Sequence, residues 1–156
     1  MKTRSPLFVA LVAAFGVSLA TVGVSALAAE TPFKGTVGAV ETGQVVFPIR
    51  SITREGTGTA TYLGKYTEHV VMQVNLLTLH GGGLATFTAA NGDILFATSD
   101  GQATRIGPTT LSIVEHYTIT GGTGRFADAT GRFTLESTLE QTTGASSGTF
   151  SGAIDH

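Results

Sequence analysis

The sequence contains no cysteine, and this absence removes several kinds of chemistry at once. No disulfide can form, no thiolate can act as a nucleophile or metal ligand, and no lipoprotein anchor can be attached. Tryptophan is also absent, and charged residues make up only 13% of the chain, against about 25% in typical soluble domains. The fold must therefore be held together by its core alone.

Basic residues are scarce as well. Nine Lys and Arg stand against eleven Asp and Glu, and the positive charges are scattered along the chain. Nucleic-acid binding requires clustered basic side chains, so we expect no nucleic-acid partner. The four histidines show no metal-ligand spacing, so we expect neither a metal site nor another cofactor.

The hydrophobic run at the N-terminus is typical of an export signal. Lys2 and Arg4 precede an uncharged stretch that ends at Ala26-Leu27-Ala28, which fits the small-x-small rule for cleavage. We expect residues 1–28 to be a signal peptide and residues 29–156 to form the mature domain, secreted or held in the periplasm or cell envelope. Contact with the membrane would then end at cleavage. The alternative is an uncleaved anchor, because the run is long enough to span about 30 Å.

The rest of the chain alternates apolar and polar residues with period two and shows no helical period. Abundant threonine and glycine favour strands separated by tight turns. We expect strands near 33–39, 57–66, 68–78, 84–90, 93–100, 109–120, 130–140 and 147–154. This series predicts an all-β fold, namely a small closed antiparallel meander β-barrel of about eight strands.

Turn-forming residues indicate where the strands are connected. Asn91-Gly92 joins two β runs and is a strong hairpin signal. Asp100-Gly101 predicts another turn, and the HGGG segment at 80–83 predicts a flexible connection. The span 41–55 is the least regular, and Pro48 within it argues against a central strand.

A glycine cluster at residues 119–131, ITGGTGRFADATG, is similar to the start of a dinucleotide-binding fingerprint. That fingerprint requires a helix after the glycines and an acidic residue about 20 positions further on. Here a second stretch with strand period follows, and too little chain remains for a doubly wound fold. The cluster therefore favours a structural role in a tight turn, where glycine permits positive φ.

The longer segment ITGGTGRFADATGRFTL resembles the late-barrel signature of the allene oxide cyclase and dirigent superfamily. The matching positions are Gly121, Gly122, Thr123, Gly124, Phe126, Ala129 and Gly131. Weaker similarity extends over GTGTATYLGKYT and ANGDILFATSDG. The resemblance implies an eight-stranded barrel with an apolar lumen, in proteins that commonly form homodimers or trimers. Phe126 is expected to plug one end of that barrel.

The resemblance does not supply an active site. Plant members of the superfamily use a glutamate on an early strand and a cysteine in the pocket, and this chain has no cysteine. The acid and arginine pocket residues of dirigent proteins have no clear counterparts here. Candidate residues must therefore be found from the strand pattern itself.

Glu115 is the most informative charged residue, because alternation places it on the apolar face of its strand. A buried carboxyl group is costly unless it is paired. It is therefore either a structural partner of an arginine or tyrosine, or an acid for proton transfer with Tyr62 or Tyr66 beside it. A bulge that turns Glu115 outward is the third alternative. Tyr117 and Phe87 are the candidate ligand contacts.

Three functions remain open at this point. The first is an exported, non-catalytic barrel that binds a small apolar molecule or serves as an interaction module in the envelope. The second is a cyclase, isomerase or dirigent-like enzyme that uses Glu115. The third is a purely structural barrel filled by side chains. An open pocket with Glu115 would favour the second, one without it the first, and a filled lumen the third.

Overall fold

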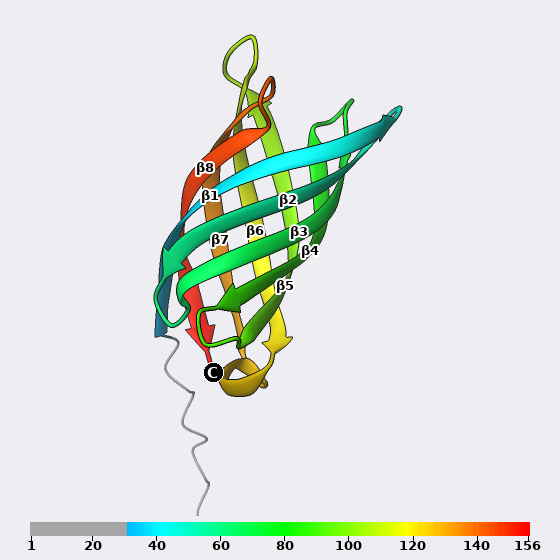
Figure 1. The fold of residues 1–156 in the computed structure, drawn as a ribbon. Coiled ribbons are helices and arrows are strands. Elements are labelled where there is room, and N and C mark those ends of the chain that lie inside the picture. Colours follow the sequence, from blue (N-terminus) through cyan, green and yellow to red (C-terminus); the bar gives the residue numbers. More distant parts are fainter. Residues whose placement is uncertain (1–30) are drawn as a thin grey trace, which may run out of the picture.

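The computed structural model describes residues 31–156, so the expected signal segment lies outside the described residues. Eight antiparallel strands follow one another around a closed barrel (Figure 1), which confirms the all-β meander predicted from the sequence. No helix within residues 31–156 has the length and apolar character needed to cross a membrane. The elements are β1 (Thr31–Val46), β2 (Ile49–Ala60), β3 (Gly64–Asn75), β4 (His80–Ala89), β5 (Ile94–Arg105), β6 (Thr110–Gly122), the short 3₁₀ helix η1 (Gly124–Phe126), β7 (Thr130–Glu140) and β8 (Ala145–Asp155).

The two ends of the barrel differ in their connections. At one end, here called the mouth, lie the turns β1–β2, β3–β4, β5–β6 and β7–β8, which are at the top of Figure 1. At the other end, here called the closed end, lie the turns β2–β3 and β4–β5 and the η1 connection (Figure 1). The start of β1 and the end of β8 also lie at the closed end.

The closed half of the lumen is a packed aromatic core. Tyr117 stacks on Phe133 with ring centroids 4.6 Å apart, and Phe126 from η1 is completely buried at the closed end. Because these rings occupy the space inside the strands, this half of the barrel is a core rather than a channel. The buried aromatic residues are Phe33, Tyr66, Phe87, Tyr117, Phe126, Phe133 and Phe150.

The first hairpin differs from the sequence-based expectation. The segment 41–55, expected to be irregular, is the long β1–β2 hairpin, and Pro48 lies in its turn, where no ladder hydrogen bond is needed from it. The strand expected over 57–66 is divided between β2 and β3 by a turn at 61–63. Tyr62 and Gly64 adopt positive φ there, at 67° and 66°.

Two glycine segments expected to be turns lie inside strands. Residues 80–83 belong to β4, and Asp100-Gly101 belongs to β5. A Cβ at Gly101 would lie 2.8 Å from the Cγ of Glu115, so this glycine makes room for a buried side chain. The Asn91-Gly92 hairpin is confirmed between β4 and β5, and Gly92 has a φ of +88°.

Candidate functional site

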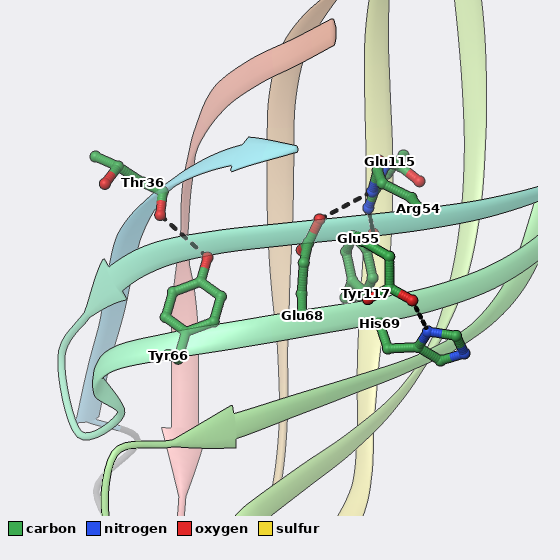
Figure 2. A network of polar contacts seen from close by, with 8 residues as sticks. All are labelled: Thr36, Arg54, Glu55, Tyr66, Glu68, His69, Glu115 and Tyr117. Atoms are coloured by element: carbon green, nitrogen blue, oxygen red, sulfur yellow. Dashed lines mark hydrogen bonds and ion pairs between the residues drawn. The ribbon is translucent and has the colours of Figure 1, made fainter. Parts of the chain in front are cut away.

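A buried arginine lies inside the barrel next to the aromatic core. Arg54 of β2 is 2% exposed. Its Nε donates to Glu68 Oε1 at 3.0 Å, its Nη1 to Glu115 Oε2 at 2.7 Å and its Nη2 to the Tyr117 hydroxyl oxygen at 2.5 Å (Figure 2). These partners come from β3 and β6. The guanidinium group therefore links β2, β3 and β6 through hydrogen bonds that are buried from solvent.

Strand alternation and nearby glycines together explain why these charged side chains point into the lumen. Arg54 faces the lumen and Glu55 faces outward, where Glu55 Oε1 lies 2.5 Å from Nδ1 of His69 (Figure 2). A Cβ at Gly56 would lie 2.8 Å from the Cγ of Glu68, so this glycine makes space for the acid as Gly101 does for Glu115. Small residues across the strands are thus part of the site.

A third acid, Glu41 of β1, lies beside this cluster. It is 6% exposed and stands directly opposite Arg54 in the β1–β2 ladder. The β1–β8 ladder ends one residue earlier, at Val40 and Ala145, and the backbone N–H of Glu41 donates to Gly144 O in the β7–β8 turn at 2.8 Å, so Glu41 lies at the mouth end of this strand pair. No side chain of residues 31–156 hydrogen-bonds or ion-pairs with its carboxyl group.

Burial raises the pKa of Glu41 and of Glu68 above the ordinary value of 4.5, and the positive charge of Arg54 only partly opposes this effect. Burial alone would lower the pKa of Arg54, but Tyr117, Glu115 and Glu68 hold it well above its usual value. Three buried acids thus share one buried arginine that stays charged. Glu41 and Glu68 therefore retain their protons to a higher pH than an exposed glutamate would.

A cavity of about 60 Å³ lies between this cluster and the mouth. A water molecule occupies roughly 30 Å³, whereas pockets for drug-sized ligands measure about 300–1,000 Å³. The cavity therefore admits a small chemical group. Its wall is mainly aliphatic, with polar groups from Glu41, Arg50, Arg54, Glu115 and Gln141; the aliphatic lining is Ile52, Met72, Val74, Leu76, Leu79, Ala103, Leu111, Ile113 and Leu139.

A larger hollow of about 790 Å³ runs over the outer wall across β1 to β4, but it offers less chemistry. Its lining consists of Thr, Ser, Gln, Gly and aliphatic side chains, with no titratable group. The candidate site is therefore the small inner cavity, where acids and arginines meet an apolar wall.

The structure brings together only some of the residues expected at the site. Glu115 lies in the lumen and is paired with Arg54, as its structural interpretation required. Tyr66 is also buried, but its hydroxyl donates to the backbone oxygen of Thr36 at 3.0 Å (Figure 2) and not to Glu115. The expectation that Tyr62 lines the lumen is wrong, since it is 39% exposed in the β2–β3 turn at the closed end.

Phe87 and Tyr117, expected as ligand contacts, are buried in the aromatic core and do not line the cavity. The alternation of side chains along each strand places both residues on the inner face correctly, but it does not indicate their position along the barrel axis. Burial raises the pKa of Tyr117 and of Tyr66 well above the usual range for tyrosine. Neither hydroxyl is therefore suited to proton transfer near neutral pH.

The glycine motif forms the β6–β7 connection over the closed end. Gly121, Gly124 and Gly131 have φ values of +127°, +55° and +141°, which other residues rarely adopt. A Cβ at Gly122 would collide with the β5 backbone. These positions and the buried Phe126 shape a turn far from the acid cluster.

The sequence analysis does not identify Glu41 or Glu68, and it leaves open which arginine pairs with Glu115. The sequence nevertheless contains a signal for Glu41 and Glu68. A turn at Phe47-Pro48 places residue 41 opposite residue 54, and two glycines follow Arg54 at alternate positions, Gly56 and Gly58. A charged residue followed by glycines at alternate positions of the same strand indicates that the lumen has space for the charged side chain.

No family model, curated protein or solved structure matches this chain. Within the described part of the chain, no group of three or more His, Cys, Asp or Glu residues is arranged to hold a metal ion. The protein is thus defined by its fold and its interior: a small closed eight-stranded antiparallel barrel with a buried acid–arginine cluster beneath a narrow cavity.

Proposed function

We propose that the barrel binds a small, largely apolar molecule through the cavity at its mouth. One observation carries this proposal: the Glu41 carboxyl is buried beside an aliphatic cavity, with no side-chain partner among residues 31–156. Its carboxyl oxygens are not sealed inside the protein, since Ser99 Oγ is the only fully buried side-chain polar atom of residues 31–156 that has no hydrogen-bond partner. A molecule that enters the cavity can therefore form a hydrogen bond with Glu41 without displacing a side-chain partner.

The chemistry of the cavity defines the ligand class. Burial favours the protonated form of Glu41, which donates a hydrogen bond, so a carbonyl, ether or hydroxyl oxygen suits it. The aliphatic wall suits a hydrocarbon chain. Because the cavity measures about 60 Å³, only the polar end fits inside, and the chain extends past Leu76 and Leu79 through the mouth.

Titration of the ¹⁵N-labelled protein with short methyl ketones tests this proposal. Chemical-shift changes are expected at cavity residues such as Ile113. The variant Ala103→Leu fills the cavity and is expected to abolish them, whereas Leu84→Ala on the outer wall should leave them unchanged. Shifts that are absent in the wild type, or that survive Ala103→Leu, would exclude ligand binding in the cavity.

A second candidate function is proton transfer, in an isomerase or cyclase. It is favoured by the raised pKa of Glu41 beside a mainly aliphatic cavity, since an acid of this kind is suited to exchange protons with a bound substrate. In this candidate Glu41 replaces Glu115 as the acting acid, because Glu115 is already held by Arg54.

Deuterium exchange separates the two candidates. In D₂O, a catalytic cluster removes a proton from the carbon next to the ketone carbonyl, and a solvent deuteron takes its place. Exchange that is faster than the buffer rate and is lost in Glu41→Gln, with ketone binding retained, would favour the enzyme. A wild-type rate equal to the buffer rate would leave binding as the function.

We further propose that the chain is exported and is a distant relative of the allene oxide cyclase and dirigent superfamily. The glycine motif at 121–131 and the eight-stranded barrel support the kinship. The small-x-small site at 26–28 supports cleavage before Ala29. N-terminal sequencing of the exported protein should begin at Ala29, and a membrane-bound form that retains Met1 would contradict this assignment.

A further inference from the structure

Large apolar side chains project from the hairpin tips at the mouth. In the β1–β2 tip, Val46 is 81% and Phe47 70% exposed; in the β3–β4 turn Leu77 is 70% exposed, and in the β5–β6 turn Ile106 is 60% exposed. Exposed side chains of this size are unusual when they gather on one part of a surface. This arrangement concentrates them at one end of the barrel.

Hydrogen bonds hold these tips together as one rim. The backbone N–H of Leu76 donates to Pro48 O at 2.8 Å, which ties the β3–β4 turn to the β1–β2 turn. The N–H of Ala103 donates to Leu79 O at 2.9 Å, which ties β5 to the β3–β4 turn. These two bonds link the β1–β2 turn, the β3–β4 turn and β5 at the mouth, from which the hairpin turns project (Figure 1).

We propose that the mouth docks on the surface of a lipid bilayer that contains anionic lipids. The exposed apolar side chains are carried by three separate hairpin turns rather than by the face of one sheet, so a protein partner would have to contact each turn separately. A bilayer takes up individual apolar side chains without such complementarity.

The charges around the rim favour the same surface. Arg105 directly precedes Ile106 and is exposed, whereas Arg50 follows the β1–β2 tip and lines the cavity just inside the mouth, so both cationic groups lie close to apolar tips. Glu140 lies at the same end, on β7, and offsets only part of this charge. Cationic residues beside inserted apolar side chains are attracted to anionic headgroups.

The same placement gives an apolar ligand a route from the bilayer into the cavity, and this consequence alone rests on the proposed function. The docking itself depends only on the tips and the flanking arginines. The barrel wall and core lie entirely within residues 31–156, so a chain that begins at Ala29 retains the whole surface without the hydrophobic N-terminal run.

Co-sedimentation of the chain that begins at Ala29 with vesicles of phosphatidylcholine containing about one third phosphatidylglycerol tests the proposal. The wild type is expected to sediment with the vesicles. The triple variant Phe47→Ser, Leu77→Ser, Ile106→Ser should lower the partition coefficient by about tenfold or more. Leu84→Ser, at an equally exposed position on the outer wall, is the matched control and should change it less than about twofold.

Two further measurements separate the electrostatic contribution of Arg105 from the apolar contribution of the tips and check that the triple variant is folded. Arg105→Gln should reduce binding about fivefold on the anionic vesicles and leave binding to pure phosphatidylcholine unchanged. Because the three tip side chains are exposed, a urea melt should show the triple variant as stable as the wild type.

The proposal is overturned if the wild type stays in the supernatant, or if the triple variant sediments like the wild type. A dimer in analytical ultracentrifugation that the triple variant abolishes would assign the tips to a second copy of the chain and would also overturn it. Ketone titration in the absence of vesicles tests the cavity separately, so a failure of docking and a failure of ligand binding remain distinguishable.

Discussion

Arg54 is the residue on which the other buried charges depend. It donates to Glu68, Glu115 and Tyr117, and it is the nearest cation to Glu41 along the strands. Replacing it with methionine keeps most of its length and leaves two buried carboxyl groups without their donor. Arg54→Met is expected to destabilise the protein by about 3–5 kcal/mol in urea melts at neutral pH, as when one member of a buried pair is removed.

Glu115→Gln provides the matched comparison at the same ion pair. This change keeps the shape of the side chain, and Arg54 retains Glu68 and Tyr117 as partners. It also removes a negative charge that raises the pKa of Glu41 and Glu68. The expected loss is therefore smaller, about 1–3 kcal/mol for one hydrogen bond to a charged group. A larger loss for Glu115→Gln than for Arg54→Met would contradict the central position of the arginine.

The ionisation of Glu41 should be visible in the pH dependence of stability. Because burial raises its pKa in the folded state, its contribution is fully present below the ordinary value of 4.5 and is lost as the pH rises through the raised value. Above this window Glu41→Gln should be more stable than the wild type, by about 1.4 kcal/mol per unit of pKa shift. Below it the difference should vanish.

Urea melts of both proteins between about pH 4 and 8 give this comparison, since the range begins near the unperturbed value for glutamate. Glu68 is present in both proteins, so its titration enters the difference only through the negative charge of Glu41, which raises the pKa of Glu68. A stability difference that stays constant across the whole range would mean that Glu41 ionises as an exposed acid, and that its place at the cavity does not affect its charge.

At the scale of elements, one turn that the sequence predicts correctly and several segments that it predicts wrongly show what limits prediction from sequence. Asn91-Gly92 specifies its own turn, because the positive φ of Gly92 closes a three-residue loop, residues 90–92, between Ala89 and Asp93 whatever surrounds it. Pro48 argues against a central strand, but a proline is equally compatible with the tip of a hairpin. Asp100-Gly101 predicts a turn and residues 80–83 predict a flexible connection, because the close approach of neighbouring backbone and side chains that requires glycine there appears only after the strands pair.

The η1 connection is the element that seals the closed end, and Phe126 is its anchor. The ring is fully buried against the core, so Phe126→Ala is expected to cost about 3–5 kcal/mol in a urea melt. Asp128→Ala in the same turn alters an exposed side chain and should change stability by less than about 0.5 kcal/mol. Equal and small effects for both variants would place the turn outside the core.

Across the whole molecule, the barrel is divided into a dry aromatic half and a polar half that opens at the mouth. The closed barrel could be predicted from the alternating strands alone, since each has one apolar face to bury. The acid cluster could not, because Glu41, Arg54 and Glu68 lie on three strands whose relative register depends on both the β1–β2 and the β2–β3 turn. A shift of one residue at either turn would exchange the inward and outward side chains.

This division should also appear in the dynamics of the chain. Residues 42–46 of β1 pair with β2 but lie beyond the end of the β1–β8 ladder, and no aromatic core lies beneath them. Segments with few buried apolar contacts open at lower free energy than the core. Native-state hydrogen exchange should therefore show amide protection about tenfold or more lower in residues 42–46 and 49–53 than at Tyr117 and Phe133.

Such opening would widen the mouth beyond the cavity volume seen in the closed barrel, as entry of a ligand chain requires. Addition of a short methyl ketone should then raise protection in the β1–β2 hairpin and leave the aromatic half unchanged, because ligand binding selects the closed hairpin. Uniform protection over all eight strands would mean that the hairpin opens only when the whole barrel unfolds. The ligand would then have to enter through the mouth as the structure shows it.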